Sequence, residues 1–72
     1  MSDREQMRVK ANGAWVEVVL PLTLGQFLVG RGLLPRSVVV EQNGEAVAPS
    51  EFAVREVRDG DVLEIVEIVA GG

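Results

Sequence analysis

Hydrophobic and polar residues alternate near the start of the chain in a way that predicts a β-hairpin. Met7–Ala11 alternates apolar and charged positions, as a half-buried strand does. Asn12-Gly13 follows, and this dipeptide is a strong hairpin signal because both central positions of a type I′ turn have positive φ. We therefore expect the return strand over Ala14–Val19 and its end at Leu20-Pro21-Leu22.

The spacing then becomes helical. Thr23 and Gln26 have the spacing of a capping box, in which each side chain accepts a hydrogen bond from the other residue's backbone N–H. Gly30 and Gly32 are expected to end the helix after about two turns. One apolar stripe at positions i, i+3 and i+4 would pack on a sheet, and it consists of Leu24, Phe27 and Leu28.

The second half of the chain is again mostly extended. Valine supplies fourteen residues of the chain, and β-branched side chains favour strands. Asn43-Gly44 repeats the hairpin signal, and Phe52 is the expected core anchor of a short helical turn. The predicted elements are strands over 37–42, 45–47 and 62–68, a helical turn over 49–53 and a turn over 58–61. This order predicts an α+β domain of the β-grasp, or ubiquitin-like, type, with one main helix across a mixed sheet of about five strands.

The last predicted strand has an unusual outer face. Alternation places Leu63 and Ile65 beneath the helix and puts Glu64, Val66 and Ile68 on the open side of the sheet. Such an open face is normally polar, so two aliphatic residues there favour a partner-binding patch. The alternative is that these aliphatic side chains are exposed without a role.

Composition narrows the possible chemistry. The 72-residue chain contains no Cys, His or Tyr, so we expect no disulfide, no thiolate or imidazole catalysis and no metal site. The acidic residues Asp59, Asp61 and Glu64 lack the spacing of a calcium loop. The composition therefore argues against an enzyme.

Charge and hydropathy argue against a nucleic-acid-binding, membrane-spanning or secreted protein. The net charge of −4 and the three scattered aromatic residues disfavour nucleic acid as a partner. No apolar run is long enough to cross a membrane, and residues 1–6 do not resemble a signal peptide, so a cytoplasmic location is expected. We interpret residues 1–6 as a flexible extension, 7–69 as the β-grasp domain and 70–72 as a flexible tail.

The chain finishes with Ala70-Gly71-Gly72, called the tail below. Glycines carry no Cβ, so they can pass through a narrow channel and present a terminal carboxylate to another enzyme. A carboxylate becomes a good electrophile only after activation, most simply by adenylation. The alternative is an ordinary frayed terminus.

Several segments together resemble the ThiS family of sulfur carrier proteins from thiamine biosynthesis, over about Met7 to Gly72. They are Asn43-Gly44-Glu45 with Val47 following, Pro49-Ser50-Glu51-Phe52, Asp59-Gly60-Asp61, Leu63-Glu64-Ile65-Val66 and Gly71-Gly72. The chain departs from the family in having Phe52 where Trp is frequent and in its extension Met1–Gln6.

The resemblance implies a carrier of sulfur and not an enzyme. In the family, an E1-like enzyme uses ATP and Mg²⁺ to adenylate the last glycine, which is Gly72 here. A sulfurtransferase or cysteine desulfurase relay then converts it to a thiocarboxylate, and thiazole synthase consumes the sulfur. No cofactor is bound, and AMP or sulfur is attached covalently at Gly72. Gly71, which has no side chain, would let the chain end pass into the narrow active site of the activating enzyme. Val66 and Ile68 would lie where β-grasp carriers contact that enzyme.

Two alternatives remain at this point. The small subunit of molybdopterin synthase shares fold, tail and chemistry, although Asn43-Gly44-Glu45 through Phe52 favours the thiamine branch. The other alternative is a ubiquitin-like interaction module with a chemically idle terminus. Incubation with ATP and an E1-like enzyme separates these classes, and the acceptor of the sulfur separates the two carriers.

Overall fold

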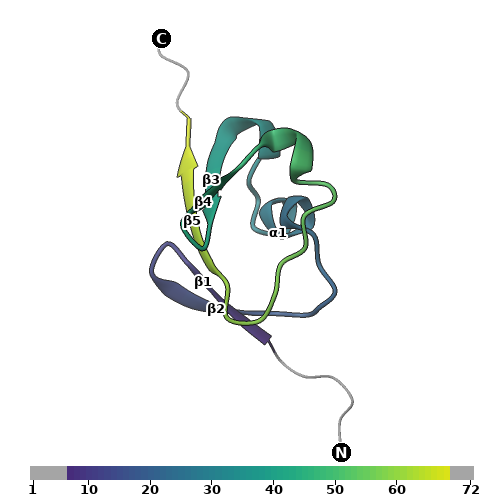
Figure 1. The fold of residues 1–72 in the computed structure, drawn as a ribbon, viewed down its shortest axis with the longest axis vertical. Coiled ribbons are helices and arrows are strands. Elements are labelled where there is room, and N and C mark those ends of the chain that lie inside the picture. Colours follow the sequence, from purple (N-terminus) through teal and green to yellow (C-terminus); the bar gives the residue numbers. More distant parts are fainter. Residues whose placement is uncertain (1–6, 69–72) are drawn as a thin grey trace, which may run out of the picture.

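A mixed sheet with the strand order β2-β1-β5-β3-β4 forms the framework of the molecule (Figure 1). The computed structural model describes residues 7–68. The elements are β1 (Met7–Ala11), β2 (Ala14–Val18), α1 (Leu24–Gly30), η1 (Pro35–Ser37), β3 (Val38–Gln42), β4 (Glu45–Val47), η2 (Pro49–Glu51) and β5 (Val62–Glu67). The predicted β-grasp arrangement of five strands and one main helix is confirmed, whereas the interpretations of residues 1–6 and of the tail lie outside the described residues.

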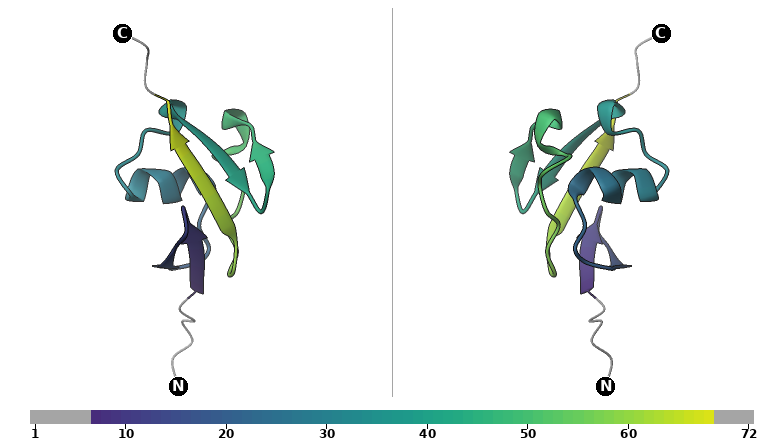
Figure 2. Two further views of the ribbon diagram at one scale, coloured as in Figure 1. Left: turned by 90° about the vertical axis from the view of Figure 1, so that its left-hand side faces the viewer. Right: turned by 90° about the vertical axis from the view of Figure 1, so that its right-hand side faces the viewer.

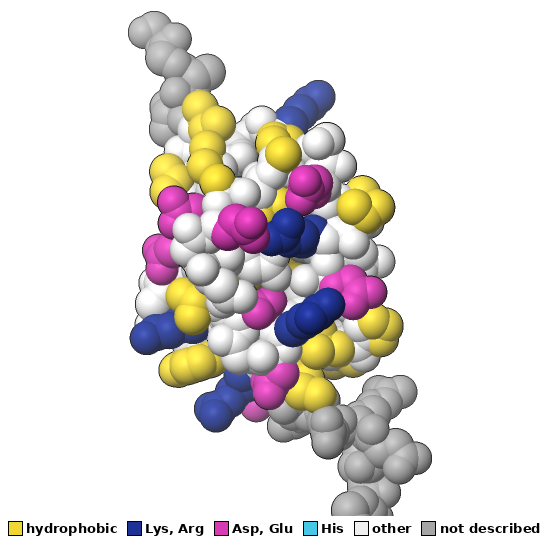
Figure 3. Space-filling view, in the orientation of Figure 1, with side chains coloured by type: hydrophobic (Ala, Val, Ile, Leu, Met, Phe, Trp, Pro, Cys, Tyr) yellow, Lys and Arg dark blue, Asp and Glu magenta, His cyan; other side chains and the backbone are white. Residues whose placement is uncertain are grey.

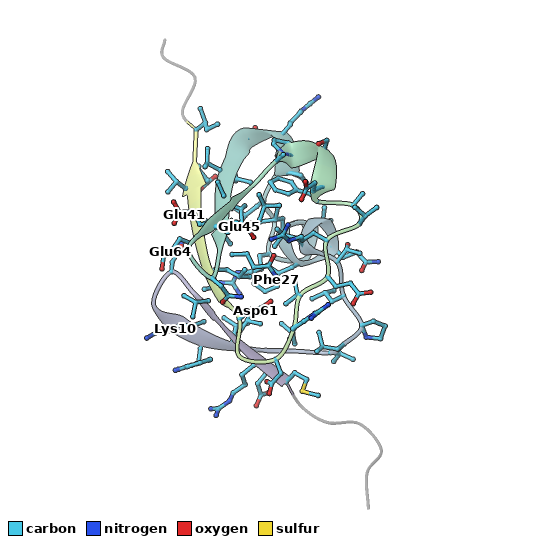
Figure 4. All side chains as sticks on the ribbon, viewed as in Figure 1. Lys10, Phe27, Glu41, Glu45, Asp61 and Glu64 are labelled. Atoms are coloured by element: carbon cyan, nitrogen blue, oxygen red, sulfur yellow. The ribbon has the colours of Figure 1, made fainter. Side chains whose placement is uncertain are left out.

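Helix α1 covers one face of the sheet and leaves the other face open (Figure 2). The predicted stripe on α1 is confirmed, since all three of its side chains are buried against the sheet. Phe27 points between α1 and the strands (Figure 4). The buried hydrophobic residues are Val9, Ala11, Val18, Leu24, Phe27, Leu28, Val38, Val40, Val47, Phe52, Val57, Leu63 and Ile65.

The start of α1 is fixed by its cap and by close packing. Thr23 Oγ1 accepts a hydrogen bond from the Gln26 N–H (3.1 Å), and Gln26 Oε1 accepts one from the Thr23 N–H (2.9 Å), so the predicted capping box is confirmed. Gly25 lies against η2, because its N–H donates to the Phe52 carbonyl and a Cβ at this position would meet that oxygen at 3.2 Å. Glycine has a low helix propensity, so Gly25 by itself weakens α1. The close approach of the Phe52 backbone explains why a glycine is nevertheless present at this position.

Strand β5 lies between the two hairpins and is bonded to the turn of each. It pairs in parallel with β1 and antiparallel with β3. Asn12, in the first turn, has a positive φ of 49°. Its side-chain amide donates to the Ile65 carbonyl (3.0 Å) and accepts from the Ile65 N–H (2.7 Å). One side chain therefore satisfies both backbone groups of Ile65 and extends the β1–β5 pairing past the end of β1.

In the second hairpin turn, on the other side of β5, an asparagine also forms hydrogen bonds to the backbone of this strand. Asn43 has a φ of 54°, and its Oδ1 accepts a hydrogen bond from the Val62 N–H (2.8 Å). The Asn43 backbone N–H donates to the Val62 carbonyl (2.7 Å). The two Asn-Gly turns predicted from the sequence thus also position the last strand, which the hairpin signal alone does not indicate.

Some predicted boundaries differ from the structure by one residue. Strand β2 ends at Val18, β5 ends at Glu67, and Ser37 belongs to η1 and not to the following strand. Strand ends are defined by individual ladder hydrogen bonds, which alternation does not specify. The structure also shows a core residue that the sequence did not predict, in the segment after η2. Val57 is buried there, and its N–H donates a hydrogen bond to the Leu22 carbonyl.

The asparagine bonds generate a stability prediction. Asn12→Gly keeps the positive φ of the turn but removes both hydrogen bonds to Ile65, so we expect the free energy of unfolding to fall by about 1–3 kcal/mol. Urea unfolding followed by circular dichroism measures the change. Asn12→Asp, which keeps the acceptor and loses the donor, should also be destabilised. A glycine variant as stable as the original chain would contradict the role given to this amide.

Candidate functional site

The open face of the sheet carries the patch predicted from the last strand. Leu63 is fully buried and Ile65 is 8% exposed, whereas Val66 is 63% and Ile68 is 55% exposed. The expected alternation of β5 is therefore confirmed, and Glu64 also lies on the open side (Figure 4). We call Glu64, Val66 and Ile68 the outer patch. Its role in binding a partner stays a prediction.

A neighbouring strand extends the apolar part of this surface. Val39 on β3 is paired directly with Val66 and is 51% exposed, while Val38 and Val40 on either side of it are buried. In the space-filling view, hydrophobic side chains gather along the end of β5 (Figure 3). Three consecutive valines show no alternation of apolar and polar residues, so the sequence does not predict that Val39 is the one on the open face. The pairing register of β3 with β5 identifies it.

Two carboxylates lie face to face beside these valines. Glu41 on β3 is paired directly with Glu64 on β5, and both side chains point away from the helix (Figure 4). Like charges directly opposite each other on antiparallel strands are destabilising. The outer patch and Glu41 together therefore present an apolar area next to two negative charges. Such a surface suits a partner that presents apolar and basic groups.

The outer patch lies at the C-terminal end of β5, where the described residues end. The Ile68 N–H donates a hydrogen bond to the Ser37 carbonyl (2.7 Å), which holds the backbone just after β5. The sequence-predicted site residues Ala70, Gly71 and Gly72 follow after Val69 in the sequence and lie outside the described residues. The structure thus brings Glu64, Val66 and Ile68 together on one face, at the end of the strand that leads into the tail.

A buried polar cluster holds the opposite end of β5. The carboxylate of Asp61 is buried and accepts hydrogen bonds from Gln42 Nε2 (2.7 Å), Asn43 Nδ2 (3.0 Å) and the Arg58 backbone N–H (2.8 Å). Gln42 in turn accepts a bond from Arg55 Nε (2.9 Å). The sequence predicts only a turn at Asp61. Its burial depends on Gln42 and Asn43, which are distant in the sequence.

The electrostatics of Asp61 fit a structural role. Burial by itself raises the pKa of its carboxyl group. Hydrogen bonds from Asn43, Arg58 and Gln42 outweigh that effect and hold the pKa below the ordinary value of 3.8. A carboxylate that stays ionised and fully bonded is a poor general acid or base near neutral pH. We therefore assign this cluster to positioning the start of β5.

Arg55 ties the same cluster to the β4 side of the domain. Its guanidinium contacts Glu45 Oε1 (2.6 Å) and Glu51 Oε1 (3.0 Å). The hydrogen bond to Glu45 raises the pKa of Arg55, so the group is a fixed positive charge. Glu45 belongs to the Asn-Gly-Glu segment of the sequence, and this ion pair gives that segment a structural role.

Two findings concern the described part of the chain as a whole. Within residues 7–68, no group of three or more His, Cys, Asp or Glu side chains is placed to hold a metal ion. No helix in the same range is long and apolar enough to cross a membrane.

Comparison with known proteins points to one family. The model of the ThiS family matches residues 3–72. A thiazole synthase from Paramagnetospirillum magneticum is 38% identical to the chain over 66 residues, which are 92% of this chain and 20% of that protein. The chain therefore spans about one fifth of the length of this curated relative.

Solved structures agree with the family match. The crystal structure of a thiamine biosynthesis protein (ThiS) from Geobacter metallireducens has a TM-score of 0.79 and 29% identity, over 92% of this chain and all of that one. An NMR solution structure of a thiamine biosynthesis protein from the same organism has a TM-score of 0.75 and 29% identity, over 92% of this chain and 88% of that one.

The two faces of β5 generate a paired prediction. Ile65→Asp places a charge in the core, so we expect it to cost more than about 3 kcal/mol and to abolish cooperative unfolding. Val66→Asp and Ile68→Asp place the same charge in solvent and should leave the melting curve nearly unchanged. Thermal unfolding by circular dichroism compares them. Melting of the Ile68 variant with a folded Ile65 variant would mean that the strand register is off by one.

The Asp61 cluster generates a pH prediction. Because the pKa of Asp61 is lower in the folded than in the unfolded chain, its stabilisation is complete above the ordinary pKa of 3.8. It is lost as the pH falls through the lowered folded value. Urea midpoints measured from neutral pH to about pH 2 should fall more steeply for the original chain than for Asp61→Asn, which has no proton to gain there. Parallel curves would contradict this assignment.

Proposed function

The chain belongs to the ThiS family, and we propose that it is a sulfur carrier protein of thiamine biosynthesis that acts through the tail. The observation that carries the proposal is the family match over residues 3–72, which includes both the outer patch and the tail. The structural neighbours are thiamine biosynthesis proteins, which supports the thiamine branch over the molybdopterin branch. The carrier itself has no catalytic residue in this proposal.

The proposed chemistry takes place at Gly72. An E1-like enzyme with bound ATP and Mg²⁺ lets the carboxylate of Gly72 attack the α-phosphorus, which releases pyrophosphate and leaves an acyl adenylate. The terminal sulfur of a persulfide on a sulfurtransferase or cysteine desulfurase relay attacks the acyl carbon and displaces AMP, which gives an acyl disulfide. A thiol then reduces this S–S bond, so that the thiocarboxylate is released and the thiol ends in a disulfide with the relay cysteine. In this proposal the partner enzyme binds the ATP and the metal, and AMP and then sulfur are attached covalently at Gly72.

The geometry supports a division of labour between the outer patch and the tail. Val66 and Ile68 offer apolar area for docking, and the Ile68–Ser37 hydrogen bond fixes the backbone direction at the exit of β5. Gly71 and Gly72 have no side chains, so they fit a narrow channel in a partner enzyme. Docking of a rigid face fixes the start of the tail, so that only the last few residues have to be ordered in the channel to place the reacting carboxylate.

Thiazole synthase is the proposed acceptor of the sulfur. The relative from Paramagnetospirillum magneticum carries that name, and a part of it resembles nearly the whole of this chain. A carrier-like segment within a thiazole synthase is consistent with carrier and synthase acting together. A short link between them would raise their effective concentration for sulfur transfer.

The tail generates the test of the proposed function. Incubation with the E1-like enzyme, ATP and Mg²⁺ should add AMP to the intact protein, and a sulfur source should then give the thiocarboxylate mass. Deletion of Gly72 and Gly71→Val should each abolish activation, because the deletion leaves the terminal carboxylate one residue short of the reacting position and the valine side chain blocks the channel. Circular dichroism should be unchanged.

The acceptor and a matched control complete this test. The charged thiocarboxylate form should lose its sulfur to thiazole synthase and not to the large subunit of molybdopterin synthase. Gly44→Ala, a glycine substitution in the second hairpin turn far from the tail, should lower stability because of the positive φ there, yet keep activation. Activation that persists in both tail variants would overturn the carrier proposal.

A further inference from the structure

The β1–β2 hairpin presents a second feature on the open face, which the proposed chemistry leaves unused. Trp15 on β2 is 54% exposed, and Lys10 on β1 is its direct cross-strand partner. Arg8 Cζ lies 5.6 Å and Lys10 Nζ 5.9 Å from the centre of the Trp15 ring. We call Arg8, Lys10 and Trp15 the Trp15 corner. Figure 3 shows basic side chains beside hydrophobic ones over this hairpin.

Among residues 7–68, the cationic groups of the Trp15 corner form no ion pair. The ion pairs formed among residues 7–68 join Arg55 to Glu45 and Glu51, and none involves Arg8 or Lys10. Glu17 is the cross-strand partner of Arg8, yet the guanidinium lies over the indole ring. The Asp59 carboxylate accepts a hydrogen bond from the Arg8 backbone N–H and not from its side chain.

An exposed tryptophan between two cations is a strong anchor for a protein partner. Trp and Arg are the residue types that most often carry binding energy at interfaces, because each combines a large contact area with a polar group. The cation–π contacts hold both positive groups within about 6 Å of the ring centre, so less conformational freedom is lost on binding. A carboxylate that reaches this corner would meet both charges at once.

The Trp15 corner is continuous with the outer patch. Lys10 is the parallel partner of Val62, which is 38% exposed at the start of β5, and the outer patch follows along the same strand. Charge therefore changes sign across the face, from positive at Lys10 to negative at Glu41 and Glu64 (Figure 4). A surface with both signs in a fixed order accepts a complementary surface in one orientation.

We propose that the Trp15 corner is a second docking point for the adenylating enzyme and that it binds an acidic segment of that enzyme, with carboxylates facing Arg8 and Lys10. The inference rests on the proposed function, which supplies the enzyme. Six residue-to-residue steps of extended chain, or about 20 Å, lead from Val62 to Ile68, so the corner and Ile68 lie at opposite ends of β5. It orients the carrier and strengthens binding.

Charge reversal tests this inference. Lys10→Glu and Trp15→Val should each raise the dissociation constant for the E1-like enzyme about tenfold, measured by isothermal titration calorimetry with the full chain. Both substitutions are at exposed or half-exposed strand positions, so the melting temperature should change little. In steady-state assays of AMP transfer, KM should rise by the same factor while kcat stays unchanged, because the corner acts before the chemical step.

Arg31→Glu is the matched control. Arg31 also lies over an aromatic ring, with its Cζ 5.7 Å from the centre of Phe27, and its reversal changes the net charge by the same amount. Phe27 is buried beneath α1, on the opposite side of the sheet from the Trp15 corner. This variant should bind the enzyme within about twofold of the original chain.

The outcomes separate the inference from the proposed function. Adenylation of the original chain, together with unchanged binding of Lys10→Glu and Trp15→Val, would overturn the docking point and leave the carrier function intact. Equal weakening by Arg31→Glu would also overturn it, because net charge alone would then explain the effect. A fall in kcat without a change in KM would count against docking. Absence of ATP-dependent activation of the original chain would overturn both proposals.

Discussion

The central strand β5 is held on both sides by asparagine side chains, and the rest of the molecule takes its position from this strand. Asn12 bonds both backbone groups of Ile65, and Asn43 bonds the N–H of Val62. The parallel pairing of β1 with β5 is short, and the two hydrogen bonds of the Asn12 side chain add to its backbone bonds. Once β5 is in place, Leu63 and Ile65 complete the core under α1 and the alternate residues form the open face.

Most of the fold follows from local signals that sequence reasoning can detect. The two Asn-Gly turns, the Thr23–Gln26 capping box and the alternation of β5 each depend on residues that are close in the sequence. Each also agrees with the global arrangement, which is the property expected of a sequence with one stable fold. The fold class and the faces of the last strand were therefore predictable.

The remaining features depend on contacts between distant segments. Val39 and Glu41 belong to the open face because β3 pairs with β5 in one particular register, which no local pattern contains. Asp61 is buried because Gln42 and Asn43 approach it from another hairpin. Gly25 looks unfavourable in a helix until the Phe52 backbone is placed against it. In the site, alternation identified the three residues on β5, and tertiary pairing was needed for their neighbours on β3 and β1.

The paired carboxylates of Glu41 and Glu64 have a consequence for how the protein behaves at high concentration. Val39 and Val66 form an exposed aliphatic area of a kind that promotes self-association. A second copy of the chain that stacked on this face with its own β3 and β5 over those of the first would bring its Glu41 and Glu64 toward the first pair. The repulsion between them would oppose stacking of two copies, whereas a basic partner would be attracted. The charge that strains the sheet locally thus disfavours this arrangement of two copies over the aliphatic area and favours a partner that presents basic groups there.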